Sequence, residues 1–312
     1  MCRSLDMDTE AAPEASAVMF VQSQPSSESG HHIRRLRGVL GDPGKKAAVC
    51  MVASGMSTLV ERTIAALRVN HNTLAALVPT LSEDNLSDPS GATEWSVAQA
   101  LSHIGSGAEI GSKPIATAAG ERVEAEDNQA IWARWNASSP ADQAAEFVKH
   151  DEAYLDTIEA LSIEQRDSLM IDLGFLPEPV PLLVALGMRL NEVANHAWDV
   201  RVGVDPSATV DQDSAELLVE LFRRPLAFLL GFSAKPDAIE REVRLTIPGG
   251  ALEITDAVTV TDSLDHPTAT FEGPAEAVVR LLSGRLGPEH AAGVTVTGNV
   301  TLDELRKVFP GY

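Results

Sequence analysis

Apolar residues recur with the period of an α-helix from Met56 to about residue 232. The first helical segment, MSTLVERTIAALRVNHNTLAALVP, ends at the turn-forming sequence SEDNLSDPSGAT. A second begins at Ser96, which has the spacing of a capping box with Gln99, and its apolar face carries Val97, Ala100, Leu101 and Ile104. This part of the chain is therefore expected to be a helical domain.

The same pattern predicts four more helices. We expect one over residues 121–136 and another over residues 139–161. Pro181 suits the first turn of a helix that runs through Val200 and stops near Gly203. The last helix follows Asp211 and carries the sequence SAELLVELFRRPLAFLLGF.

After residue 236 the period changes from helical to alternating. REVRLTIPGG and ALEITDAVTVTD alternate as half-buried strands do, with Gly249 and Gly250 forming the turn between them. TATFEG and GVTVTGN predict a third and a fourth strand. PAEAVVRLLSGRLG predicts a helix, and TLDELRKVF a closing helix that Thr301 caps. Strands mixed with helices after an all-helical block indicate a separate, small α+β domain.

Residues 1–55 show no sustained period, and we expect them to be a disordered extension. The sequence thus divides into 1–55, a helical domain over 56–235 and an α+β domain over 236–312. Both cysteines, Cys2 and Cys50, lie in the first segment, which argues against a disulfide framework and fits a reducing cytoplasm.

Charge narrows the range of partners. The formal net charge is −21, and because residues 1–55 are neutral, all of it falls on the remainder of the chain. Such an acidic body repels phosphate backbones and anionic lipid, so neither nucleic acid nor a membrane is an expected partner. No apolar run approaches the roughly 18 residues that a membrane span needs. A small molecule is the expected partner, and the chain is expected to be a monomer or a small homo-oligomer.

The helix from Pro181 to Val200 carries the first candidate chemistry. Arg189, Glu192, His196 and Asp199 form a polar stripe beside an apolar one. Glu192 and His196 are four residues apart, so they are neighbours on the helix surface and could bind one ion together. A solvated charged face with local pairing would give the same pattern.

His103 could complete a metal site. It lies at the edge of the apolar face of the helix that Ser96 begins, and facing helices of a bundle could direct His103, Glu192 and His196 into one pocket. Three such ligands with a fourth position open describe a catalytic divalent site, most often zinc. Taken alone, His103 would more often be a histidine of the core or its boundary.

Two segments together carry a resemblance to a known family. WSVAQALSHI, followed some 90 residues later by NEVANHAWDV, resembles the DinB-like, mycothiol-dependent maleylpyruvate isomerase family of actinobacteria. FEGPAEAVVRLLSGRLG and VTVTGNVTLDELRKVFPG resemble the sterol-carrier-like domain attached to that family. The resemblance covers about residues 56–312, and one departure is Glu94, where the family often has glycine.

The resemblance implies both a fold and a cofactor. It implies a DinB-like four-helix bundle followed by a sterol-carrier-like α+β domain, with His103, Glu192 and His196 as metal ligands. It also implies that mycothiol supplies the thiol, whose thiolate would add to a cis double bond and leave after rotation. A transferase would keep the carbon–sulfur bond, so isomerisation and S-transfer to a small electrophile both stay open.

Such an addition creates negative charge that a nearby cation could stabilise. Arg285 is our catalytic candidate, although an arginine on the surface at a helix end would look the same. Arg189 is a second candidate, but pairing with Glu192 or Asp199 would explain it equally well.

The remaining candidate residues are expected to be structural. Trp95 and Trp198 are expected to be packing anchors, with pocket lining as the alternative. Asp199 could orient a ligand or pair with Arg201. We expect the other histidines to lie on the surface or in the N-terminal extension: His71, His150, His266, His290, His31 and His32.

A function of another class fits the same sequence. The sterol-carrier-like domain could hold an apolar small molecule or lipid, while the metal site is structural or vestigial. Metal content and acyl-chain binding would separate this possibility from an enzyme.

Overall fold

The computed structural model describes residues 49–92 and 94–311, with side chains from Thr58 onward, and all of these fall in one compact unit. The expected disordered extension falls mostly on residues 1–48, which lie outside the described residues, as do His31 and His32. The helix expected to begin at Met56 begins at Val49. Among the described helices none is long and apolar enough to cross a membrane.

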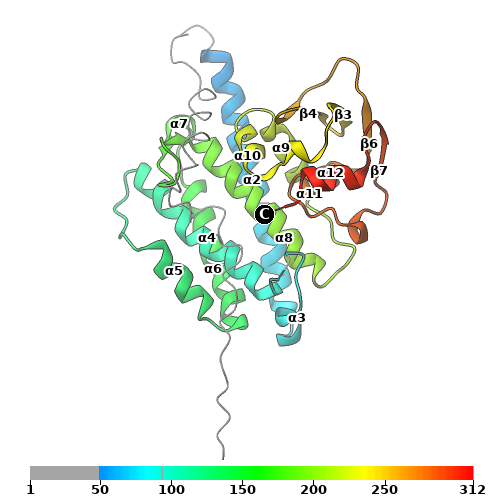
Figure 1. The fold of residues 1–312 in the computed structure, drawn as a ribbon. Helices are drawn as coiled ribbons and strands as arrows, with labels where there is room; N and C mark the ends of the chain where they lie inside the picture. The colour runs from blue at the N-terminus through cyan, green and yellow to red at the C-terminus, as the bar shows by residue number, and fades with distance from the viewer. Residues whose placement is uncertain (1–48, 93, 312) are drawn as a thin grey trace, which may run out of the picture. The chain divides into compact units, whose positions relative to one another are not determined.

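Four long helices form a bundle (Figure 1). They are α2 (Val49–Leu77), α4 (Val97–Ala118), α6 (Pro140–Glu159) and α8 (Leu182–Val202). Each packs against two others, because α4 contacts α6 and α8, and α2 contacts the same two helices. Ser96 and Gln99 form the expected capping box at the start of α4, so the sequence fixes where the helix bearing His103 begins.

Shorter elements connect the long helices. They are η2 (Val78–Thr80), α3 (Glu83–Ser87), α5 (Asn128–Asn136), α7 (Ile163–Ser168) and a two-stranded pairing of β1 (Met170–Ile171) with β2 (Val180–Pro181). The helix expected over 121–136 is therefore too long. Residues 121–127, ERVEAED, have almost no apolar side chains to bury, and the side chain of Asp127 caps α5.

The helix expected after Asp211 is two helices. The side chain of Asp211 caps α9 (Gln212–Phe222), and α10 (Ala227–Ser233) follows. Pro225 lies between them and has no N–H to continue the helical hydrogen bonds, which explains the break. The short turn η3 (Pro236–Ala238) leads into the α+β part.

The α+β part has one five-stranded sheet in the order β5-β4-β3-β6-β7. Its strands are β3 (Val243–Ile247), β4 (Gly250–Ile254), β5 (Val258–Thr261), β6 (Ala269–Glu272) and β7 (Thr295–Gly298). The pair β3–β6 is parallel, with Leu245 opposite Ala269, and the other pairs are antiparallel. The segment expected as one strand over 251–262 is two, because the chain turns at residues 255–257.

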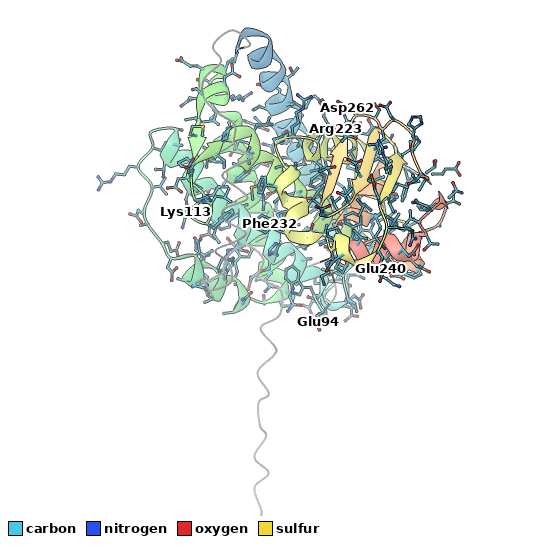
Figure 2. The ribbon with its side chains drawn as sticks, turned by 45° about the horizontal axis from the view of Figure 1, so that its top comes forward. Glu94, Lys113, Arg223, Phe232, Glu240 and Asp262 are labelled. Carbon is cyan, nitrogen blue, oxygen red and sulfur yellow. The ribbon has the colours of Figure 1, made fainter. Side chains whose placement is uncertain are left out.

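Two helices and a turn complete this part: α11 (Ala275–Leu282), η4 (Pro288–His290) and α12 (Leu302–Val308). All eight residues of α11 are buried, and α11 packs against α9. Arg223, just after α9, donates a hydrogen bond from Nη1 to Oδ1 of Asp262 over 2.9 Å, which ties the helical part to the end of β5 (Figure 2). These contacts place the loop after α11, which carries Arg285, beside the bundle.

Candidate metal centre

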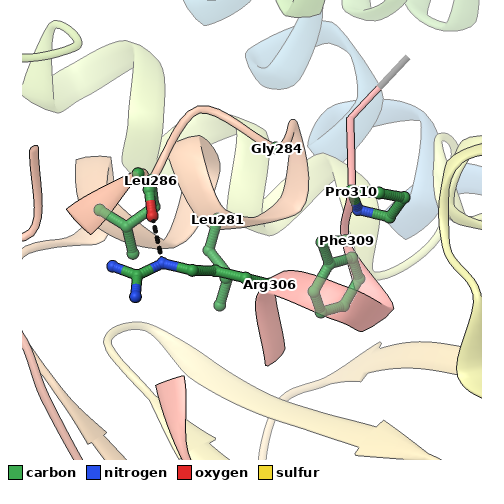
Figure 3. A pocket seen from close by; sticks show the side chains of 7 residues that line it. Leu281, Gly284, Leu286, Arg306, Phe309 and Pro310 are labelled. Carbon is green, nitrogen blue, oxygen red and sulfur yellow. Dashed lines mark hydrogen bonds between the residues drawn. The ribbon is translucent and has the colours of Figure 1, made fainter. Parts of the chain in front are cut away.

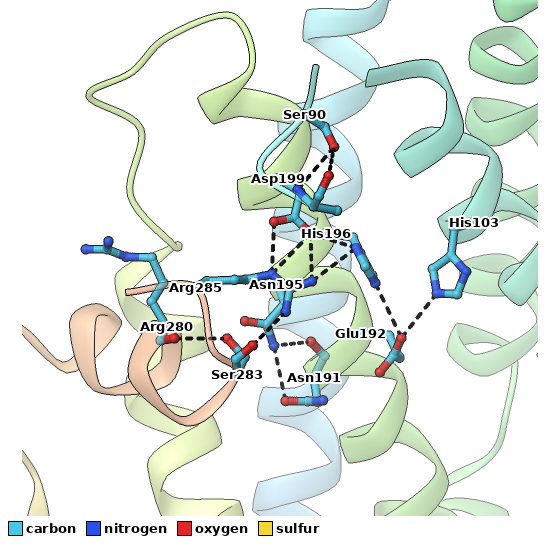
Figure 4. Close-up of polar contacts among 11 residues, drawn as sticks. Ser90, His103, Asn191, Glu192, Asn195, His196, Asp199, Arg280, Ser283 and Arg285 are labelled. Carbon is cyan, nitrogen blue, oxygen red and sulfur yellow. Dashed lines mark hydrogen bonds and ion pairs between the residues drawn. The ribbon is translucent and has the colours of Figure 1, made fainter. Parts of the chain in front are cut away.

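His103, Glu192 and His196 come together in the bundle. Each offers one ligand atom, and the three atoms lie within 4.8 Å of one another. Nε2 of His103 is 3.2 Å from Oε2 of Glu192, and Nε2 of His196 is 3.6 Å from the same oxygen (Figure 4). The three residues expected from the sequence are thus brought to one place from α4 and α8.

These separations fit the donor set of a tetrahedral ion. Ligands about 2.0–2.1 Å from zinc lie about 3.3 Å from each other at tetrahedral angles, close to both distances from Glu192. Two imidazole nitrogens and one carboxylate oxygen also match the composition of catalytic zinc sites. The side chains of His103 and Glu192 are 32% and 27% exposed and that of His196 is 11% exposed, so solvent reaches the triad from the side of His103 and Glu192.

The environment holds two of the three residues in the protonation states that a metal requires. Burial opposes ionisation of Glu192, but hydrogen bonds from both histidines outweigh it and hold the pKa of this carboxyl far below its usual range. Burial lowers the pKa of His103, which keeps its imidazole neutral. A carboxylate and a neutral imidazole are the forms that bind metal.

Asp199 orients His196. It is fully buried, and its Oδ2 lies 2.7 Å from Nδ1 of His196. Burial disfavours the imidazolium, but this hydrogen bond and the one to Glu192 together outweigh it and raise the pKa of His196. With Nδ1 held by the carboxylate, Nε2 faces Glu192 and the position between the ligands. Of the two roles expected for Asp199, orienting a ligand is the one that fits, because Arg201 instead donates to backbone carbonyls.

Arg285 reaches the same carboxylate from the α+β part. Its Nη2 donates to Oδ2 of Asp199 over 2.7 Å and its Nε to Oδ1 over 2.9 Å, a bidentate pair. Nη2 also lies 3.4 Å from Nδ1 of His196. Arg285 is therefore beside the triad and mostly buried, not on the surface at a helix end.

Arg189, the second catalytic candidate, lies inside the bundle. It pairs with neither Glu192 nor Asp199. Its Nη2 donates to Oδ1 of Asp151 over 2.7 Å and to the carbonyl of Ile104 over 2.9 Å, inside the bundle.

Trp95 covers the two imidazoles, so pocket lining describes it better than remote packing. Its ring centroid lies 4.9 Å from that of His103 and 5.5 Å from that of His196. The loop that carries Trp95 is drawn against α8 at Gly91, whose N–H donates to the carbonyl of Asp199 over 2.9 Å. A Cβ at Gly91 would lie 2.6 Å from Val202, so this approach requires glycine.

Trp198 is the packing anchor that was expected. It is fully buried, and its Nε1 donates to the carbonyl of Ala208. Of the histidines expected on the surface, His266 is exposed, while His150 and His290 are half-buried. His71 is buried between Asp151 and Glu152, and the expectation for it was wrong.

The comparisons with known proteins cover the part of the chain that carries the triad. Residues 67–201 match the family model described as mycothiol maleylpyruvate isomerase N-terminal domain, and this range contains the whole triad. Two crystal structures, of the mycothiol-dependent maleylpyruvate isomerase and of a histidine-to-alanine mutant of it, share the fold. Each aligns with a TM-score of 0.52 and 18% identity, over 81% of this chain and 97% of the other. No curated protein matches the chain.

Proposed function

We propose that the chain, whose residues 67–201 match the model of the mycothiol maleylpyruvate isomerase N-terminal domain, is a divalent-metal enzyme that uses mycothiol on a small electrophile. The observation that carries the proposal is the convergence of His103, Glu192 and His196 on one position open to solvent. Zinc is the ion we favour. The reaction is cis–trans isomerisation or S-transfer, and dependence on a reduced thiol favours the cytoplasm.

A bound dication would supply a site for the thiol sulfur and lower the pKa of the thiol. The net charge around the triad would favour the binding of one thiolate. Glu192 offsets one of the two positive charges, and Asp199 is offset by Arg285. With neutral histidines the loaded site carries about one positive charge, which a single thiolate neutralises.

The protein's own residues would position and shield the reactants. Trp95 covers the two imidazoles and restricts water to the open side. Arg285, held beside His196 by Asp199, would place a cation where negative charge develops on an electrophile. We propose Arg285 as a catalytic residue and the α+β part, which we regard as sterol-carrier-like, as the element that delivers it.

One assay tests the proposal and separates the two reactions. The zinc-loaded full chain is incubated with maleylpyruvate and mycothiol, and the products are followed by mass spectrometry, with glutathione as the control thiol. Product of unchanged mass indicates isomerisation, and a retained thioether indicates transfer. His196→Ala should abolish turnover while the far-UV circular dichroism is unchanged. Equal turnover by this variant would contradict the proposal.

A second function rests on one observation. A largely apolar pocket of about 160 Å³ lies between the loop after α11 and α12, lined by Leu281, Leu286 and Phe309 among others (Figure 3). Arg306 borders it and donates from Nε to the carbonyl of Leu286 over 2.7 Å. The guanidinium of Arg306 is already paired with Asp303, so the lining suits an apolar ligand. Stoichiometric binding of a fluorescent fatty acid by a chain that takes up no zinc would favour this alternative.

A further inference from the structure

Beside the triad lies a buried polar cluster that joins all four long helices. It consists of His71 from α2, Asp151 from α6, Arg189 from α8 and the carbonyl of Ile104 from α4. Nδ1 of His71 lies 2.9 Å from Oδ2 of Asp151, and Nη2 of Arg189 donates to Oδ1 of Asp151 over 2.7 Å. His71 and Asp151 are each 3% exposed. The proposed chemistry uses none of these side chains.

Arg189 connects the two ligand-bearing helices close to the ligands themselves. It precedes Glu192 by three residues, about one turn of α8. The carbonyl that accepts its 2.9 Å hydrogen bond belongs to Ile104, the residue after His103. This bond therefore fixes the position of α8 along α4 at the level where His103 and Glu192 must meet.

Stability alone does not explain the arrangement. A buried ion pair is weak evidence for stability, because desolvation offsets much of the attraction. In addition, Nε of Arg189 is buried without a hydrogen-bond partner among the described residues. Such groups are best attested as devices that fix register, which is what a site assembled from two helices needs.

The chain also makes room for this guanidinium. A Cβ at Gly107, one turn beyond His103 in α4, would lie 2.9 Å from Nη1 of Arg189, and no other atom lies within 4 Å of it. The contact is with the end of a flexible side chain, so alanine there would displace Arg189 with little strain elsewhere.

We propose that Arg189, held by Asp151 and His71, is a positioning residue that sets the separation of His103 and Glu192 and so prearranges the metal site. This inference rests on the proposed function, since it assumes that the triad binds a metal.

Two variants of the full chain test it. Arg189→Met removes the guanidinium, and Gly107→Ala displaces it while keeping its charge. Affinity is measured with zinc against a chromophoric chelator, geometry by the visible spectrum of the cobalt-substituted protein, and folding by the melting temperature of the metal-free protein. Gly231→Ala is the matched control, because its Cβ meets nothing within 4 Å. Arg189→Lys tests rescue.

Both variants should bind zinc about 10-fold or more weakly, the scale of lost supporting contacts in metal sites. Their cobalt spectra should change, metal-free Gly107→Ala should still give a cooperative melting transition, and Arg189→Lys should recover part of the affinity. If Arg189→Met does not fold, Gly107→Ala alone decides.

Wild-type affinity and an unchanged cobalt spectrum in folded Gly107→Ala and Arg189→Met would overturn the inference but leave the proposed function standing. A wild-type chain that takes up neither zinc nor cobalt would overturn both. Equal weakening in Gly231→Ala would mean that the effect is not specific to Arg189, which also overturns the inference.

Discussion

At the scale of single residues, Asp199 links the candidate ligand His196 to Arg285. It holds both through one fully buried carboxylate, with oxygen–nitrogen distances of 2.7 Å to each. The geometry makes the tautomer of His196 and the position of Arg285 depend on the same group. Removing its charge should therefore affect metal binding and stability together.

Asp199→Asn should lower the affinity for zinc by about 10–100-fold, because the supporting partner of His196 is lost. It should also lower the free energy of unfolding by about 3–5 kcal/mol, since Arg285 stays largely buried without its counter-charge. Competition with a chelator measures the zinc affinity, and urea denaturation measures the free energy of unfolding. Adding Arg285→Met should restore much of the stability and none of the affinity; recovery of affinity would show that Asp199 does not orient His196.

Glu94 precedes the tryptophan that covers the triad and has a positive φ of 71° (its exposed side chain is labelled in Figure 2). Left-handed backbone costs an L-residue about 1–2 kcal/mol, and glycine costs about 0.5–1 kcal/mol in extra chain entropy. Glu94→Gly should thus raise the free energy of unfolding by about 0.5–1 kcal/mol. His266→Gly, at φ 56°, should do the same, and a loss of stability in both would contradict this reading.

At the scale of elements, α4 approaches α6 closely enough to exclude side chains. A Cβ at Gly105 would lie 2.3 Å from Trp135 and 2.9 Å from the Cα of Phe147 in α6. This close packing places the helix that carries His103. Because a backbone atom blocks the space, the strain of an added methyl group cannot be relieved by a side chain alone.

Gly105→Ala should lower the free energy of unfolding by about 1–3 kcal/mol through overpacking, despite the better helix propensity of alanine. Gly231→Ala, in an open position of α10, should instead gain about 0.5–1 kcal/mol. Chemical denaturation measures both. Similar changes in the two variants would mean that α4 and α6 are not in contact at Gly105.

Asp151 joins α6 to α2 and α8, and its titration gives a pH dependence. Burial opposes its ionisation, but the hydrogen bond from His71 and the charge of Arg189 outweigh it, and they lower the pKa of Asp151 below its ordinary 3.8. A depressed folded-state pKa adds stability above pH 3.8 that is lost as the pH falls through the folded value. The stability gap between wild type and Asp151→Asn should therefore be constant above pH 5 and narrow below pH 3.8; a gap unchanged down to pH 2 would contradict this.

The sequence predicted the long helices and the pairing of Glu192 with His196 because both depend on local signals. Ser96 and Gln99 marked the start of α4, and the four-residue spacing of Glu192 and His196 marked one face of α8. That His103 lies opposite Glu192 came from family resemblance, since spacing says nothing about which helices meet. The turn at 255–257 was missed because the alternation of apolar and polar residues continues through it, and the start of α5 was missed although Asp127 offered a local capping signal.

The sequence also did not predict pairings between residues that are far apart along the chain. Nothing near Asp199 in the sequence shows that Arg285, 86 positions away, reaches it, and Arg201 was the nearer partner to expect. His71 has no charged partner at helical spacing in the sequence. In the structure it is buried and pairs with Asp151 from another helix. Trp95 directly precedes Ser96, the capping residue of the helix that carries His103. This position could have indicated that its ring lies near the triad.

At the scale of the whole molecule, metal binding at the proposed site would be coupled to folding. An ion held by α4 and α8 together would bind the folded state only, so it would stabilise that state by mass action. At free zinc 100 times the dissociation constant the gain is about 2.7 kcal/mol. Zinc should raise the melting temperature of the full chain and a chelator should reverse the rise. The same addition should leave His103→Ala unchanged, and an equal rise in that variant would point to binding elsewhere.

The central claim is that three side chains from two helices bind one divalent ion. Calorimetric titration of zinc into the chelator-stripped full chain tests it most directly, with His103→Ala and Glu192→Gln beside it. The account predicts about one tight site per wild-type chain, as expected of a three-ligand centre, and loss of that site in both variants. A wild-type chain with no tight site, or variants that bind zinc as it does, would contradict the account.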